Sequence, residues 1–231
     1  LGTLTVHGLC RVAEPYRDIV PPIHLASTFE RGEDGGYPGG RMYSRDGSPA
    51  YIEVEEVLRQ LEGGTQALVF ASGHAAASAV LQALQAGDRV VAPRAMYWGL
   101  RKWLLDLAEH GYIELAFYDN VDLADLDRQL AAAPTRLLWI ETPANPTWEV
   151  TDLRAAIALA QKHGAHTLVD STVATPVLSQ PLALGADIVL HSATKYLNGH
   201  SDVVAGALIT REDSALWQRV HSALPSARNF W

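Results

Sequence analysis

Short apolar segments alternate with segments of helical pattern from residue 48 onward, and this alternation restricts the chain to few folds. Two of the apolar segments, 137–140 and 188–190, are continuously apolar, as in strands buried on both faces. The pattern predicts strands at 67–70, 89–92, 112–117, 136–141, 166–170, 187–191 and 203–209, and helices at 49–62, 73–85, 97–109, 123–132 and 152–163. Strands that alternate with helices in this way predict an α/β fold, with a mostly parallel central sheet flanked by helices.

The N-terminal segment has a different character. Residues 1–47 contain Pro15, Pro21, Pro22 and four glycines between positions 35 and 40, a density typical of an extended segment rather than of a packed domain. The whole chain has 231 residues, of which 48% are hydrophobic, and this is enough for a sizeable core. We therefore predict an extended arm at residues 1–47 and one α/β domain at residues 48–231.

Charge and cysteine content exclude several classes of function. The chain has 18 Lys and Arg against 26 Asp and Glu, a formal net charge of −8, which argues against a nucleic-acid partner. The single cysteine, Cys10, excludes a disulfide framework and fits a reducing compartment. No histidine spacing matches a metal site. No segment resembles a signal peptide or reaches the ~18 apolar residues of a membrane span, so we expect a cytoplasmic protein without a membrane partner.

Small residues follow the strand predicted at 67–70. Ligands of an open α/β sheet bind at the carboxyl ends of its strands. Ser72, Gly73 and His74 stand at this position and open a predicted helix, whose first free N–H groups are suited to a phosphate. A tight turn that only eases packing is the plainer interpretation of the same residues.

One of the three lysines stands apart from the others. Lys102 and Lys162 lie in predicted helices, where they can point to solvent, whereas Lys195 follows the buried strand 187–191 together with Ser192 and Thr194. A lysine in such a place favours Schiff-base chemistry.

A carboxylate completes this set, because Asp170 ends the strand at 166–170. An amine, a carboxylate that keeps a pyridine nitrogen protonated, and hydroxyl and N–H groups for a phosphate are what pyridoxal phosphate (PLP) requires. In this interpretation Lys195 moves protons between Cα and Cβ of the substrate. The phosphate is bound by the hydroxyls of Ser192 and Thr194 and by the backbone N–H groups of Gly73 and His74.

The segment around the lysine resembles a family signature. It reads Ser-Ala-Thr-Lys-Tyr-Leu-Asn-Gly-His-Ser-Asp at 192–202, and it is similar to the lysine motif of the cysteine/methionine-metabolism (trans-sulfuration) family of PLP-dependent enzymes, which includes cystathionine γ-synthase and the cystathionine lyases. Further matches follow in order at 43–45, 61–64, 72–73, 141–146 and 170–176. The resemblance implies the large domain of PLP-dependent transferase fold type I, PLP as cofactor, and β/γ-elimination or γ-replacement on sulfur amino acids or activated homoserine.

The resemblance also implies roles for single residues. Lys195 matches the lysine that binds PLP covalently, and Asp170 matches the partner of the pyridine nitrogen. Tyr97 matches a tyrosine that stacks on the cofactor ring and assists proton transfer. Asn145 matches a residue near the substrate carboxylate and the cofactor hydroxyl.

The arm has a role in this family as well. Tyr43 and Arg45 match residues that reach the phosphate in the neighbouring subunit. The resemblance therefore implies a homodimer with shared sites, and a homotetramer built from two such dimers. The other partner expected is a small amino-acid substrate.

The sequence departs from the family pattern at several positions. His74 stands where methionine is usual, Ser171 replaces an asparagine, and Trp98 and Leu100 make the wall beside the ring bulkier. Family members continue into a C-terminal domain whose arginine grips the substrate carboxylate, and Arg228 lies too early to match it. Two alternatives stay open: another fold-type-I PLP enzyme such as an aminotransferase, or a truncated, non-catalytic relative. The motifs also do not separate synthase from lyase.

Overall fold

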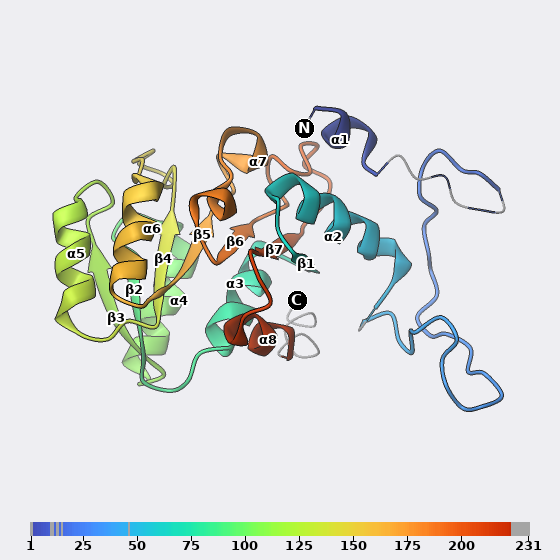
Figure 1. The fold of residues 1–231 in the computed structure, drawn as a ribbon, viewed down its shortest axis with the longest axis horizontal. Coiled ribbons are helices and arrows are strands. Elements are labelled where there is room, and N and C mark those ends of the chain that lie inside the picture. Colours follow the sequence, from blue (N-terminus) through green and yellow to red (C-terminus); the bar gives the residue numbers. More distant parts are fainter. Residues whose placement is uncertain (1, 10–11, 13, 15, 46, 223–231) are drawn as a thin grey trace.

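A seven-stranded sheet forms the centre of the fold (Figure 1), in a computed structural model that describes residues 2–9, 12, 14, 16–45 and 47–222. Its strands lie in the order β1-β7-β6-β5-β4-β2-β3. Their bounds are Gln66–Phe70 (β1), Asp88–Pro93 (β2), Ile113–Tyr118 (β3), Leu137–Glu141 (β4), His166–Asp170 (β5), Ile188–His191 (β6) and Gly206–Thr210 (β7).

The sheet is mostly parallel, which confirms the predicted fold class. Strands β3, β2, β4, β5 and β6 pair in parallel, whereas β7 is antiparallel to both β6 and β1. The strand predicted at 203–209 begins only at Gly206, because residues 192–205 form a loop without a crossover helix that returns the chain beside β6. All strands except β7 therefore end at the same edge of the sheet.

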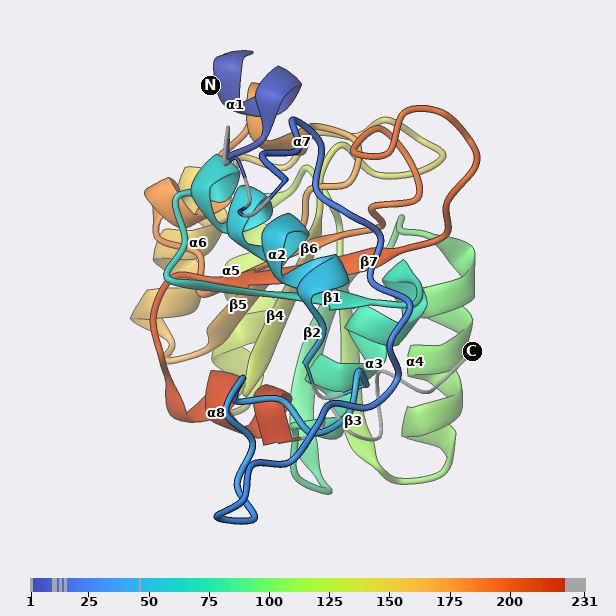
Figure 2. The same cartoon turned by 90° about the vertical axis from the view of Figure 1, so that its right-hand side faces the viewer.

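Helices cover both faces of the sheet (Figure 2). Those that the sequence predicts are α2 (Pro49–Glu62), α3 (Gly73–Gln82), α4 (Trp98–Glu109), α5 (Leu123–Ala132) and α6 (Leu153–Lys162). The side chains of Ser48 and Ser72 cap the N-termini of α2 and α3, and Gly63 ends α2 in the left-handed conformation at φ 68°. Four short elements were not predicted: α1 (Gly2–His7), α7 (Thr175–Leu178), α8 (Ala215–Ser222) and the 3₁₀ helix η1 (Pro181–Leu184).

Each face of the sheet has its own core. Alternate residues of a strand point to opposite faces, so Leu137 and Trp139 of β4 pack with α3, α4 and α8, whereas Leu138 and Ile140 pack with α2, α5 and α6. All four side chains are completely buried. This two-sided burial explains the continuous apolar run that the sequence shows.

The arm extends away from the sheet, beyond α2 (Figure 1). Residues 2–7 form the short helix α1, which packs against α2, in a segment expected to be extended. Further on, Thr28 and Tyr43 form an isolated antiparallel bridge, and the N–H of Ser44 donates to the carbonyl of Ser27 at 2.8 Å. Among the residues that the structure describes, no helix is long and apolar enough to cross a bilayer, and no cluster of acidic, histidine or cysteine side chains is suited to a metal ion. Cys10, Pro15 and Arg228 lie outside the described residues.

Candidate active site

Ionisable side chains gather at the carboxyl edge of the sheet. Glu141, Asp170 and His191 are the last residues of the neighbouring strands β4, β5 and β6, and Glu141 pairs in register with Asp170. Lys195 follows four residues after His191. The sheet therefore brings two carboxylates, an imidazole and the loop of the predicted lysine to one edge.

The loop before α3 lies directly against the loop that carries the lysine. A Cβ added to Gly73 would lie 2.8 Å from Ser192 Cβ and 2.9 Å from its Cα. The Ser72 hydroxyl accepts the N–H of Ala75, and no described residue accepts the N–H groups of Gly73 or His74. The free donors and the positive end of the α3 dipole make this junction suited to an anion.

Asp170 has one oxygen committed and one available. Its Oδ1 accepts the hydroxyl of Thr172 at 2.6 Å and the backbone N–H of Thr172 at 3.0 Å, while no described residue donates to Oδ2. Burial raises the pKa of the Asp170 carboxyl, against the hydrogen bonds from Thr172. A cationic donor at Oδ2 would offset that cost.

Thr172 also connects the carboxylate to the lysine loop, because its Oγ1 accepts the N–H of Ser192 at 2.8 Å. The loop then turns, with the N–H of Lys195 donating to the carbonyl of Ser192. The hydroxyl of Thr194 donates to Ala205 O and accepts from Ala205 N at 3.0 and 2.9 Å. A phosphate would therefore compete with Ala205 for the hydroxyl proton of Thr194. The Lys195 residue is exposed.

Glu141 holds the two loops that carry Tyr97 and Asn145. The N–H of Tyr97 donates to both Glu141 oxygens at 2.9 and 3.1 Å, and the N–H of Asn145 donates to Oε1 at 2.9 Å. Burial, together with the charge of Asp170, raises the pKa of Glu141 to about 7. The ring of Tyr97 folds back over Gly99, where an added Cβ would lie 2.8 Å from Tyr97 Cε1.

A buried pair fixes the strand before the lysine loop. Nε2 of His191 lies 2.5 Å from Oε1 of Glu62, the last residue of α2, and neither side chain is exposed to solvent. Within the described part of the chain, Nδ1 of His191 and Oε2 of Glu62 have no hydrogen-bond partner. The pair ties α2 to β6 across 129 positions of sequence. The imidazole of His74, at the start of α3, packs against Trp103. Partial burial lowers the pKa of the His74 imidazole.

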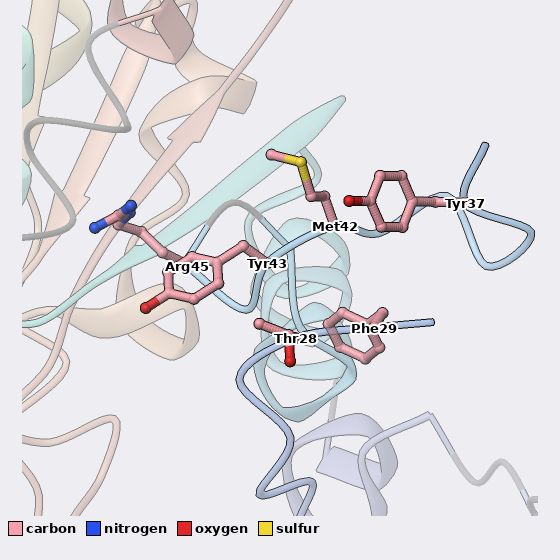
Figure 3. A pocket seen from close by; sticks show the side chains of 6 residues that line it. All are labelled: Thr28, Phe29, Tyr37, Met42, Tyr43 and Arg45. Atoms are coloured by element: carbon pink, nitrogen blue, oxygen red, sulfur yellow. The ribbon is translucent and has the colours of Figure 1, made fainter. Parts of the chain in front are cut away.

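Tyr43 and Arg45 lie on the arm rather than at this edge. They line a cavity of about 320 Å³ with Thr28, Phe29, Tyr37 and Met42 (Figure 3). The guanidinium of Arg45 stands over the Tyr43 ring, 4.8 Å from its centroid, a cation–π arrangement.

Sequence reasoning missed three of the residues that shape the edge: Thr172, Glu62 and Glu141 as a hydrogen-bond acceptor. All three lie within the segments that carry the family resemblance. The available signal was a carboxylate at the end of a buried strand, which applies to Glu141 as much as to Asp170.

Comparison with known proteins finds similar sequences in one enzyme family. Residues 2–227 match the family model described as Cys/Met metabolism PLP-dependent enzyme. A cystathionine beta-lyase of Lactococcus lactis is 45% identical over 215 residues, which cover 91% of this chain and 55% of the relative. A cystathionine gamma-synthase of Mycobacterium tuberculosis is 44% identical over 215 residues, with 92% and 55% covered.

Solved structures agree with the sequence matches. The crystal structure of a cystathionine gamma synthase from Xanthomonas oryzae in complex with cystathionine superposes with a TM-score of 0.91 at 39% identity, covering 97% of this chain and 57% of that one. The chain thus spans little more than half the length of the curated relatives it matches.

Proposed function

The chain belongs to the Cys/Met metabolism family of PLP-dependent enzymes, and we propose that it forms the cofactor-binding part of an enzyme that performs β- or γ-elimination or γ-replacement on sulfur amino acids or activated homoserine. The observation that carries the proposal is the contact of Gly73 with Ser192, at the same sheet edge as Asp170. The names of the similar proteins, cystathionine beta-lyase and gamma-synthase, support the substrate class.

The groups at this edge fit PLP. The Gly73–Ser192 junction would hold the phosphate, because a side chain on Gly73 would fill it and free N–H donors face it. The unoccupied oxygen of Asp170 would hold a proton on the ring nitrogen. Lys195 would bind the cofactor covalently, since its amine is on the loop that Thr172 ties to Asp170.

The cofactor draws electron density away from the substrate Cα when it is bound. The chain's own residues would then manage protons and orientation. Asp170 would keep a proton on the ring nitrogen, and Lys195, as a neutral amine, would move a proton between Cα and Cβ of the substrate. Tyr97 would present its ring to the cofactor, and Asn145 would contact the cofactor hydroxyl and the substrate carboxylate.

Spectroscopy and product analysis of the full-length protein test this proposal. We expect a visible absorption band of bound PLP that borohydride removes, and turnover of cystathionine, of methionine, or of O-activated homoserine with cysteine. A colourless protein that binds no PLP would contradict the proposal and favour a non-catalytic relative. Amino-group transfer to a keto acid, without elimination or replacement, would favour an aminotransferase.

Substituting Gly73 with alanine is expected to weaken PLP binding roughly 5- to 150-fold, because the new methyl group collides with Cβ and Cα of Ser192 and overpacking costs about 1–3 kcal/mol. Fluorescence titration of the cofactor-free protein measures the dissociation constant. Gly39→Ala is the matched control, since its added Cβ has no neighbour within 4 Å. Equal affinity of the Gly73 variant and the parent for PLP would show that the phosphate does not bind at this junction.

The arm supports a second proposal, that each site is shared between two copies of the chain. Ile19 and Leu25 of the arm are each 91% exposed and Ile23 is 86% exposed, and apolar side chains so open to water favour a docking surface. The guanidinium of Arg45 is suited to a phosphate, because its planar fork makes paired hydrogen bonds. We propose a two-fold dimer in which Tyr43 and Arg45 reach the partner's site, and a tetramer of two such dimers.

Mixing two inactive variants tests the shared site. Arg45→Ala and Lys195→Ala subunits should regain activity together, because a hybrid dimer contains one site with both residues intact. The assay is turnover after subunits have been shown to exchange by a labelled tag. Recovery is expected to be absent when Lys195→Ala subunits are mixed with each other. No recovery in the mixed sample, despite exchange, would assign Arg45 to its own subunit or to no site.

The relatives extend well beyond the length covered here. We propose that the group which grips the substrate carboxylate lies outside these 231 residues, and that the protein acts in a reducing, cytoplasmic setting. The single cysteine supports this setting.

A further inference from the structure

A single buried carboxylate holds two exposed residues of the candidate site. Glu141 is 5% exposed, whereas Tyr97 is 41% exposed and Asn145 is also exposed. The backbone N–H groups of both residues donate to Glu141 at 2.9–3.1 Å, although Tyr97 follows β2 and Asn145 follows β4. Two separate loops are thus fixed to the end of one strand.

The hydrogen bonds from Tyr97 to Glu141 satisfy the backbone N–H at the start of α4. Tyr97 occupies the N-cap position of α4, and its side chain makes no capping hydrogen bond. The first N–H groups of a helix lack partners within the helix, and a negative charge at this end is favourable for the helix dipole. From the end of β4, Glu141 accepts the N–H of the N-cap residue and so fixes where α4 begins, and the helix dipole favours the ionised form of this carboxyl group.

This arrangement carries an electrostatic cost. Glu141 pairs in register with Asp170, and two neighbouring buried carboxylates repel one another. An apolar residue at the end of β4 would avoid that repulsion, but it would leave the N–H groups of Tyr97 and Asn145 without an acceptor. Arrangements that lower local stability in this way concentrate at functional sites.

We propose that Glu141 is a positioning residue, which acts through the backbones of Tyr97 and Asn145 to hold the tyrosine ring and the asparagine amide in place for the cofactor. The role of Glu141 rests on the proposed function for what these two side chains contact. The role of Glu141 differs from that of Asp170, because both Glu141 oxygens accept hydrogen bonds from backbone N–H groups and neither is left for a ligand.

Amide hydrogen exchange in the cofactor-free, full-length protein tests the first half of the proposal. Glu141→Ala should accelerate exchange at the amides of Tyr97 and Asn145 about tenfold, because both N–H groups lose their hydrogen-bond acceptor. The amide of Ala95 is an internal control, since it donates to Asn120 Oδ1 at 3.0 Å and not to Glu141. Unchanged exchange at Tyr97 and Asn145 would overturn the proposal.

Cofactor binding by the same variants tests the second half. We expect the PLP dissociation constant to rise about tenfold in Glu141→Ala and less in Glu141→Gln, which keeps one acceptor oxygen. The visible circular dichroism per bound PLP should fall in the same order, whereas a purely structural role would lower thermal stability alone. Glu149→Gln is the matched control, because it removes a carboxylate from the loop that carries Asn145, and no hydrogen bond among the described residues joins that carboxylate to Tyr97 or Asn145. The contact of Glu149 with Ala144 is made by its backbone carbonyl, which the variant retains.

The outcomes separate this proposal from the proposed function. Parent protein that binds PLP, combined with Glu141 variants of unchanged affinity and dichroism, would overturn the positioning role and leave the function standing. Parent protein that binds no PLP would overturn both. If Glu141→Ala does not fold, Glu141→Gln is the variant that tests the proposal. Amide exchange and dichroism equal to those of the parent in Glu141→Gln would overturn it.

Discussion

Replacing Lys195 with alanine is expected to abolish the covalent linkage to PLP and to leave the fold intact. Lys195 is exposed on the loop after β6, and no described residue contacts its amine by hydrogen bond or ion pair. The backbone turn that places it depends on Ser192 O and on the N–H of Lys195, both of which alanine retains. Borohydride reduction followed by mass analysis should locate the pyridoxyl label on Lys195 in the parent and nowhere in the variant. The cofactor-free parent and the cofactor-free variant should have the same melting temperature.

The other lysines provide the control for this experiment. Lys162 pairs with Asp127 at 3.0 Å on the surface, and exposed ion pairs of this kind add little to stability. Lys162→Ala should therefore keep the label and nearly all stability. A label on Lys102 or Lys162 in the parent would contradict the assignment of Lys195.

Replacing Asp170 with asparagine is expected to keep the covalent cofactor and to lower kcat by well over tenfold. An amide can still accept the Thr172 hydroxyl that holds Asp170, so the local structure should survive. It cannot hold the ring nitrogen protonated, and losing such a charge interaction costs about 3 kcal/mol of barrier, or roughly 150-fold in rate. Steady-state kinetics measure the loss, with the exposed Asp213→Asn as control. Activity within tenfold of the parent would exclude the role.

The same substitution has an expected effect on pH dependence in the cofactor-free protein. Burial raises the pKa of Asp170 above its ordinary value of 3.8. The folded state therefore holds this proton more tightly than the unfolded state, and stability falls as pH rises from about 4 through the raised pKa. Asparagine does not ionise, so the variant should lose less stability than the parent over that range in urea denaturation. An equal loss of stability in the variant and the parent would show that burial does not raise the pKa of Asp170.

The sequence predicts those parts of the structure that depend on local pattern. Continuous apolar runs such as 137–140 identify buried strands, and Ser48 and Gly63 bound α2 as capping chemistry requires. Asp170 and Lys195 could be singled out because Asp170 ends a buried strand and Lys195 lies on the loop after another. The short helix α8 was missed although it carries a local signal, since the hydroxyl of Ser214 accepts the N–H of Trp217 at its start. The direction of β7 depends on which strand it joins.

The remaining parts of the site depend on distant contacts. The Glu62–His191 pair joins residues 129 positions apart, and Glu141 meets Tyr97 across 44 positions. No local periodicity specifies these partners, since they meet only once the order of the strands is set. The role of Thr172 is likewise visible only when β5 and β6 lie side by side.

The place of β1 at the edge of the sheet has a consequence for how the protein is made. β1 pairs only with β7, which the ribosome completes roughly 140 residues later, or about 7–30 s at ordinary rates of translation. During that interval the backbone of Gln66–Phe70 has no strand to pair with, and its exposed edge is the kind that associates with other nascent chains. A polypeptide interrupted between Ser192 and Gly206 would contain both Gly73 and Ser192 but would lack β7, which lies between the strands that they follow. The proposed phosphate junction is therefore complete only after β7 has been translated.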